Sequence, residues 1–323
     1  MRFEGNQEVL RNLFRKKKLL EAGDVEHYNY RTALLGCSGV MRGVYGGGQM
    51  SALERFGLTN AFDTVVGIST GAALGAFFVA GQMQSDIDVF WKEGASAEFV
   101  SFKRFLLRRG PLADTTALTR AFRRRLDQEK AYCSRTNFFT AVTCAETGAG
   151  KLLNAKLMPD LLEAVHASFA MPGLCGKVVD IDGEPYLDGA GAMSFPSEAV
   201  VEQLEPTDLL VLANCTDEHK KDKRTTAFFN NLLLSNFPEP VRKTFNTRHA
   251  SFPKGVQYLR NQTKVRWGIL WTDAEVGYFE FNPQRLMAGA KRAEAYFAPL
   301  LQKAKVYVDR EHQEVYTRAL AAE

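Results

Sequence analysis

The chain has 323 residues, of which 46% are hydrophobic and 24% are charged. These values are typical of a folded globular protein and exclude a disordered or fibrous chain. The formal net charge of +4 is too small to indicate nucleic-acid binding by the protein as a whole.

Residues 1–30 are rich in charge and are predicted to form an N-terminal helical extension without a strand. Their apolar residues recur at helical spacing: Val9, Leu10, Leu13, Phe14 and Leu20. The segment has no apolar region of the kind found in a signal peptide. The longest nearly apolar stretch of the chain, Gly71 to Gly81, is far shorter than the roughly 20 residues of a membrane-spanning helix.

Two units of strand, loop and helix follow. In the first, a strand at Thr32–Leu35 leads through a glycine-rich turn, Gly36 to Gly48, into a helix over residues 50–56. In the second, a strand over residues 62–66 leads through a tight turn, Gly67 to Gly71, into an apolar helix. Alternation of this kind favours a largely parallel sheet covered by helices.

The remaining elements continue this pattern less regularly. We expect helices over much of 82–135 and at 161–168, strands at 138–144, 177–181, 185–187 and 208–213, a hairpin turn at Asp182-Gly183, a late hairpin within 268–281, and a final helix over 283–302. The predicted fold is therefore a three-layer α/β/α core over 31–215 with a mainly parallel central sheet. A mostly helical region over 216–323 would cap or flank it.

The sequence Gly67-Ile68-Ser69-Thr70-Gly71 matches the GxSxG pattern in the expected setting, with a strand before it and a helix after it. The two glycines would let the Ser69 hydroxyl stand exposed on a strained turn, and the helix dipole would favour negative charge there. Ser69 is thus a candidate nucleophile, with Gly67 and Gly71 as the glycines of a nucleophile elbow. The alternative is a glycine-rich packing turn.

A nucleophilic serine needs a base, and none of the five histidines stands in a local pattern that presents it. Asp188 precedes Gly189 at the predicted end of a strand and is the leading candidate, although an isolated Asp-Gly pair is usually just a turn. An ordinary aspartate, with a pKa of about 3.9, is a weak base. We therefore predict that apolar neighbours such as Tyr186 and Leu187 raise the pKa of Asp188.

The segment Gly36 to Gly43 lies about 30 residues before Ser69, where a parallel sheet would place it beside the serine turn. Its amides could form an oxyanion hole. A phosphate-binding role for a nucleotide is disfavoured because the segment has neither a GxxxxGK[ST] nor a GxGxxG pattern.

The order of these motifs resembles the patatin-like phospholipases, especially their bacterial branch. Residues 38–43 stand where that family has Gly-Gly-Gly-x-Arg-Gly. Residues 167–172 and 182–190 are similar to its Ala-Ser-x-Ala-x-Pro and Asp-Gly-x-x-Tyr-x-Asp-Gly-Gly/Ala stretches. The resemblance covers roughly residues 31–215.

The resemblance implies a Ser-Asp dyad without histidine, metal or cofactor, acting on ester bonds of phospholipids, lysophospholipids or acylglycerols. By position, Ser69 would be the nucleophile and Asp188 the base. The amides around Gly39 and Val40 would form the oxyanion hole, with Arg42 shaping the loop. Ser38 and Val40 replace two family glycines, and a β-branched residue is costly wherever φ must be positive.

Two other interpretations remain open. An α/β-hydrolase with a Ser-Asp-His triad could use one of the histidines after Asp188, namely His219, His249 and His312, but that fold usually places more strands before its nucleophile. A patatin-like protein that binds lipid or a protein partner without turnover is the second, because Val40 could weaken the oxyanion hole.

Location and surface properties rest on weaker patterns. Five cysteines without a CxxC pair favour reduced thiols in a cytoplasmic protein. Basic residues form two clusters. The first cluster is residues 15–18, and the second cluster consists of Lys103, Arg104, Arg108, Arg109, Arg120, Arg123, Arg124 and Arg125. Such clusters are commonly solvated helix faces. They also fit peripheral contact with the anionic inner face of a membrane.

Overall fold

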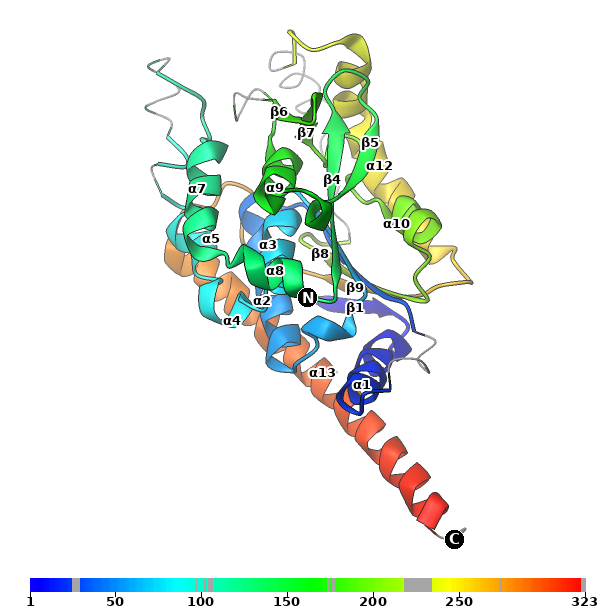
Figure 1. Cartoon of the computed structure of the whole chain (residues 1–323). Coiled ribbons are helices and arrows are strands. Elements are labelled where there is room, and N and C mark those ends of the chain that lie inside the picture. Colours follow the sequence, from blue (N-terminus) through cyan, green and yellow to red (C-terminus); the bar gives the residue numbers. More distant parts are fainter. Residues whose placement is uncertain are drawn as a thin grey trace.

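The computed structural model describes residues 1–24, 30–96, 98–101, 103, 107, 109–172, 175, 178–217, 234–273 and 275–320. A nine-stranded sheet runs through its centre in the order β1-β9-β8-β2-β3-β4-β7-β6, with β5 beside β4 (Figure 1). The strands are β1 (Arg2–Gly5), β2 (Thr32–Gly36), β3 (Thr64–Ile68), β4 (Asn137–Cys144), β5 (Gly150–Asn154), β6 (Val179–Ile181), β7 (Glu184–Asp188), β8 (Asp208–Ala213) and β9 (Arg266–Trp271).

Helices cover both faces of this sheet (Figure 1). They are α1 (Glu8–Glu21), α2 (Gly43–Arg55), α3 (Thr70–Val79), α4 (Met83–Asp86), α5 (Val89–Lys92), α7 (Thr115–Arg125), α8 (Gln128–Cys133), α9 (Leu161–Phe169), α10 (Ser197–Leu204), α12 (Glu239–Arg260) and α13 (Pro283–Leu320). The five strands β9, β8, β2, β3 and β4 pair in parallel, and antiparallel strands flank them on either side. The predicted three-layer α/β/α class is confirmed.

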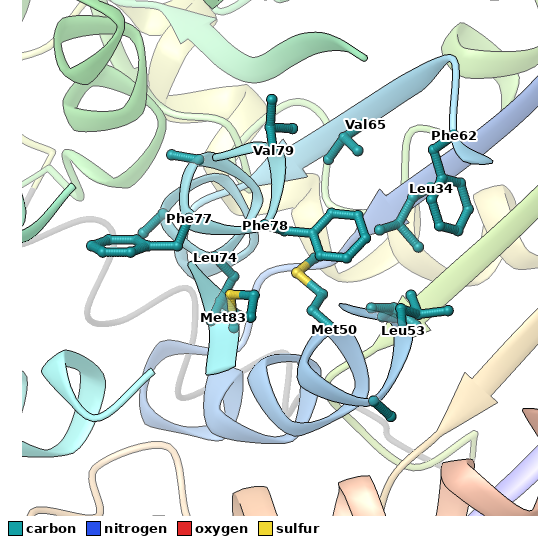
Figure 2. Packing of buried hydrophobic residues seen from close by; sticks show 14 of the residues in the cluster. Leu34, Met50, Leu53, Phe62, Val65, Leu74, Phe77, Phe78, Val79 and Met83 are labelled. Carbon is teal, nitrogen blue, oxygen red and sulfur yellow. The ribbon is translucent and has the colours of Figure 1, made fainter. Parts of the chain in front are cut away.

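The two sheet faces bury different side chains because successive residues of a strand point in opposite directions. Leu34 of β2 faces the layer formed by α1, α2, α3, α9 and α13, whereas Leu35 faces α10 and α12. Figure 2 shows the first layer, where side chains of α2 and α3 meet those of the sheet: Met50, Leu53, Leu74 and Phe78 against Leu34 and Val65. Full burial of each such side chain contributes about 2 kcal/mol.

Two predictions about strands were wrong. Residues 2–5 form β1, although no strand was expected before residue 30, and residues 266–271 form β9 instead of opening a late hairpin. β9 pairs in parallel with β8, and β1 pairs antiparallel with β9. Both partners are remote in sequence, so the local pattern could not reveal the pairing. The sheet thus takes strands from both regions that flank 31–215.

The glycine-rich turn predicted over residues 36–48 was also partly wrong, because α2 already begins at Gly43. A Cβ on Gly48 would lie 2.0 Å from the carbonyl oxygen of Ala290 in α13, and one on Gly46 would lie 2.9 Å from Asn214 Oδ1. These glycines therefore serve close packing inside a helix. Their unfavourable helix propensity, about 1 kcal/mol each, is offset by the buried contacts.

The N-terminal helix packs into the core instead of presenting an apolar face to the outside. Its predicted apolar residues Val9, Leu10, Leu13 and Phe14 are buried. The four basic residues at 15–18 are all engaged inside the chain: Arg15 with Glu311 (2.8 Å), Lys16 with Asp63, Lys17 with the Phe56 carbonyl (2.8 Å) and Lys18 with Asp309 (2.9 Å). This cluster therefore has a structural role in joining α1 to its neighbours.

The last helix, α13, extends to Leu320, well past the predicted end at residue 302. Figure 1 shows its C-terminal part running beyond α1 and away from the sheet. Among the helices that the structure describes, none combines the length and apolarity needed to cross a bilayer.

Candidate active site

Ser69 occupies the bend between β3 and α3 and has a strained backbone, with φ 54° and ψ −119°. A non-glycine residue in so unfavourable a region costs on the order of 1–3 kcal/mol and persists only where the surroundings enforce it. Here the Ser69 carbonyl accepts hydrogen bonds from the amides of Ala72 (2.9 Å) and Ala73 (3.3 Å), which fix it to the first turn of α3. The residue as a whole is buried, with 6% of its surface exposed.

Gly67 and Gly71, on either side of Ser69, allow close approach of backbone segments. A Cβ on Gly67 would lie 2.3 Å from Cα of Ala72, and one on Gly71 would lie 2.1 Å from the carbonyl oxygen of Gly36. Real Cβ atoms do not tolerate such distances. Only glycine at these positions lets the start of α3 lie directly against β2 and β3.

Asp188 ends β7, and the structure brings it next to Ser69. The Ser69 Oγ donates a hydrogen bond of 3.0 Å to Asp188 Oδ2. The other carboxylate oxygen accepts from the amide of Ala190 at 2.8 Å, and the Asp188 carbonyl accepts from Thr143 Oγ1 at 2.8 Å. The sheet explains the meeting, because β4 pairs on one side with β3 and on the other with β7, where Val142 is opposite Asp188.

Ser168 joins these two residues and was missed by the sequence reasoning. Its Oγ accepts a 2.9 Å hydrogen bond from the Ser69 amide and donates one of 2.7 Å to the Ala141 carbonyl. Its own carbonyl accepts from the Gly189 amide at 3.1 Å. The only available signal was its place in the family-like stretch 167–172, which suggests no chemical role by itself.

The predicted oxyanion loop lies beside the serine bend. Val40 has a φ of 50°, so this β-branched residue adopts the left-handed conformation that is costly for its type. Thr70 Oγ1 donates a 2.9 Å hydrogen bond to the Val40 carbonyl and so ties the loop to α3. Within the described part of the chain, the amides of Gly39 and Val40 donate no hydrogen bond, whereas the Arg42 amide bonds to the Gly39 carbonyl.

Residues 276–278, which follow β9, contact the predicted oxyanion loop and hold it in place. Arg42 Nε donates to the Val276 carbonyl at 2.9 Å, and its guanidinium lies 4.2 Å from the centre of the Tyr278 ring. The Met41 amide donates to the Tyr278 carbonyl at 3.3 Å. Arg42 therefore shapes the loop by binding residues 276–278.

The buried Tyr45 strengthens the same support. Its hydroxyl donates to Asp273 and accepts from the Val276 amide at 2.9 Å. Burial, together with the hydrogen bond to Asp273, raises the pKa of Tyr45 to about 12. Burial works to raise the pKa of Asp273, but the Tyr45 hydroxyl, the Glu275 amide and the charge of Arg292 outweigh it and hold that pKa below its ordinary value.

Asn214, just after the end of β8, binds residues on both sides of the predicted oxyanion loop. The sequence reasoning did not identify this residue. Its Nδ2 donates to the Cys37 carbonyl at 2.7 Å, and its Oδ1 accepts from the Gly46 amide at 2.8 Å. A Cβ on Gly39 would lie 2.7 Å from Cβ of Asn214, which explains why glycine stands at position 39.

The described histidines His166 and His249 form hydrogen bonds with groups other than Ser69 and Asp188. His249 Nδ1 is 2.9 Å from the Asn246 carbonyl and His166 Nε2 is 3.0 Å from Thr115 Oγ1, while His219 lies outside the described residues. Among the residues that the structure describes, no group of three or more histidines, cysteines or acidic residues could hold a metal ion.

A sequence model of the patatin-like phospholipase family matches residues 37–201, a span that contains Ser69, Asp188 and the loop before them. The match covers about half of the chain, and the protein belongs to this family. A search of curated proteins found no match.

A comparison with solved structures aligned the chain with two bacterial proteins. VipD from Legionella pneumophila is 12% identical with a TM-score of 0.42, and the alignment covers 86% of this chain and 67% of VipD. Full-length ExoU from Pseudomonas aeruginosa, solved in complex with SpcU, is 13% identical with a TM-score of 0.41, and the alignment covers 85% and 52% of the two chains. The chain thus spans about half the length of ExoU.

Proposed function

We propose that the protein is a serine lipid-acyl hydrolase that cleaves ester bonds of phospholipids, lysophospholipids or acylglycerols through a Ser69–Asp188 dyad. The observation that carries the proposal is the 3.0 Å hydrogen bond from Ser69 Oγ to Asp188 Oδ2, formed by two buried side chains at the positions of the family motif. The proposed chemistry requires neither a metal ion nor a cofactor.

In the proposed reaction, Asp188 Oδ2 takes the proton of Ser69 Oγ as that oxygen attacks the ester carbonyl carbon. The negative charge that develops on the carbonyl oxygen would be stabilised by the amides of Gly39 and Val40, which donate to no other described group. Collapse of this intermediate returns the proton to the departing alcohol oxygen. Water, deprotonated by Asp188, then attacks the acyl-serine. The bond between the acyl carbon and Ser69 Oγ breaks, Asp188 returns the proton to Ser69 Oγ, and the fatty acid is released.

The strain at Val40 supports a role for the loop in this reaction. A valine at φ 50° is held there by surrounding contacts, including Thr70 Oγ1, and backbone strain of this kind clusters at functional sites. The Val40 side chain therefore need not abolish the oxyanion hole. The non-catalytic alternative, a lipid-binding or partner-binding protein, predicts that Ser69 is unreactive.

The test is acyl release from p-nitrophenyl esters and a panel of phospholipids, in the presence of a chelator, compared among wild type, Ser69→Ala and Asp188→Asn. We expect both variants to fall to background while their melting temperatures stay near that of wild type. Labelling by a fluorophosphonate should occur in the wild type and be lost in Ser69→Ala. Wild-type activity no higher than that of Ser69→Ala would refute the proposal.

The triad alternative needs a separate comparison. Replacing His219, His249 and His312 one at a time by alanine should leave activity within about two-fold of wild type if the dyad acts alone. Loss of activity in any one of the three, with an unchanged melting temperature, would favour a Ser-Asp-His triad.

Peripheral contact with an anionic membrane surface from a cytoplasmic location is the second part of the proposal. Arg123 pairs with Asp160, and Arg125 pairs with Asp86 and Asp88. Besides Arg123, four described basic residues of the second cluster are exposed: Lys103, Arg109, Arg120 and Arg124. Arg104 and Arg108 lie outside the described residues. The four exposed residues are the ones that we propose to meet anionic head groups.

A further inference from the structure

Helix α12 lies against the segment that follows Asp188, on the sheet face opposite α2 and α3 (Figure 1). Gly191 has no room for a Cβ, which would lie 2.5 Å from the ring of Phe245. Ser197 Oγ donates to the Gly255 carbonyl at 2.7 Å, and Ser194 is hydrogen bonded to Ser251. These contacts fix α12 in place beside the dyad.

Arg248 of α12 has a buried side-chain donor for which the packing of the helix supplies no acceptor. Its carbonyl accepts from Ser251 Oγ at 2.9 Å, but its Nε is buried and has no hydrogen-bond partner. The guanidinium forms no ion pair within the described ranges. Arg248 as a whole is partly exposed, so its guanidinium keeps contact with solvent on one side. A buried N–H donor without an acceptor is costly, so native proteins rarely retain one without a use for it.

The surroundings of this guanidinium lie at the candidate active site. Among the residues that the structure describes, the titratable side chains whose charges act on it are Asp188 and Tyr278. The ring of Tyr278 also lies against Arg42, whose guanidinium is 4.2 Å from the ring centre. Burial lowers the pKa of Arg248 against the opposing attraction of Asp188, but the ordinary pKa of arginine lies so far above neutral pH that the side chain remains a cation.

We propose that Arg248 binds the phosphate group of a glycerophospholipid whose ester carbonyl lies at Ser69, so that the enzyme binds phosphate-bearing lipids more tightly than neutral acylglycerols. This inference rests on the proposed hydrolase function. A guanidinium presents a planar set of donors that matches two phosphate oxygens. In a glycerophospholipid the phosphate and the esters share one glycerol unit, which agrees with the placement of Arg248 beside Asp188.

The inference is tested with two substrates that differ only in the phosphate head group. Lysophosphatidylcholine and the monoacylglycerol with the same acyl chain are presented in identical mixed micelles to wild type, Arg248→Gln, Arg248→Lys and the control Arg242→Gln, an exposed arginine of the same helix. We expect Arg248→Gln to raise KM for lysophosphatidylcholine on the order of 10- to 100-fold and to leave KM for the monoacylglycerol within about two-fold. Arg248→Lys should fall between, because lysine keeps the charge but not the fork of donors.

Three outcomes would overturn the inference. Equal losses on both substrates, with a lower melting temperature, would mean that Arg248 is structural. We expect the melting temperature of Arg248→Gln to be no lower than that of wild type, because the variant removes a buried Nε donor that has no acceptor. An unchanged ratio between the substrates would exclude lipid phosphate as the ligand. Inhibition of p-nitrophenyl ester hydrolysis by inorganic phosphate that needs Arg248, with that ratio unchanged, would assign the site to free phosphate.

Failure of the hydrolase proposal itself gives a different result. In that case wild type releases no more acyl chain than Ser69→Ala from either lipid, and this inference falls with it. A wild type that is active on both lipids, with Arg248→Gln equal to Arg242→Gln, overturns the role of Arg248 alone.

Discussion

The hydroxyl of Thr70, the residue after the proposed nucleophile, donates a 2.9 Å hydrogen bond to the carbonyl of Val40. This bond links the first turn of α3 to a loop residue with a φ of 50°. It therefore couples the position of Ser69 to that of the two amides proposed to stabilise the oxyanion. The order of the proposed site depends on this link and on the bonds of Ser168.

Thr70→Val removes this link while keeping the shape of the side chain. We expect kcat for ester hydrolysis to fall on the order of 10-fold with KM nearly unchanged, because the loop would lose its alignment with the reacting carbonyl. Thr70→Ser keeps the hydroxyl and should retain most of the activity. Equal kcat in Thr70→Val and wild type would show that the link does not position the loop.

Ser168→Ala should reduce both stability and kcat. The substitution leaves the buried Ser69 amide without its acceptor and the Ala141 carbonyl without its donor, which costs about 1–3 kcal/mol. Urea unfolding measures the free energy of unfolding, and p-nitrophenyl ester hydrolysis measures kcat. A variant with wild-type values of both would contradict a positioning role for Ser168.

Asp273→Asn tests the support behind the loop through its dependence on pH. The pKa of Asp273 in the folded protein lies below its ordinary value of 3.8, so the carboxylate adds stability above that value and this contribution is lost as the pH falls through the folded pKa. Wild type should therefore melt at a higher temperature than Asp273→Asn at neutral pH. The difference should shrink below about pH 4. A difference that stays constant with pH would count against this role of the charge.

Gly48→Ala should destabilise the protein by several kcal/mol. The new Cβ would lie 2.0 Å from the Ala290 carbonyl, so α2 and α13 would have to separate. Gly277→Ala is the matched control, because a Cβ there meets nothing within 4 Å. Denaturant unfolding of the two variants compares them directly, and similar midpoints would disprove the packing argument.

Arg120→Glu combined with Arg124→Glu should weaken binding to vesicles that contain phosphatidylserine. Each basic residue near an anionic surface contributes about 1 kcal/mol, and the effect should fade at high salt. Lys291→Glu combined with Lys303→Glu makes the same change in net charge on exposed positions of α13. Sedimentation with vesicles should separate the two pairs; equal binding would leave the membrane contact without support.

Local sequence patterns predicted much of this protein. The strands at 32–35 and 208–213, the hairpin turn at Asp182-Gly183 and the bend at Ser69 all depend on neighbouring residues, because glycine content and alternation constrain φ and ψ directly. The same is true of the place of Asp188 at the end of a strand. Each of these features is determined within a short stretch of the chain, so the sequence by itself was sufficient to predict it.

Only the tertiary structure decided which distant groups meet. The pairing of β1 with β9, the use of Gly46 and Gly48 inside a helix, and the contacts of Ser168 each join residues that are far apart in sequence. Arg248 gives no signal in the sequence, since a lone arginine on a helix is usually solvated. Its proposed role can be inferred only from the packing of α12 beside Asp188. Burial changes the free energy of a polar or charged group, and burial is a property of the folded chain.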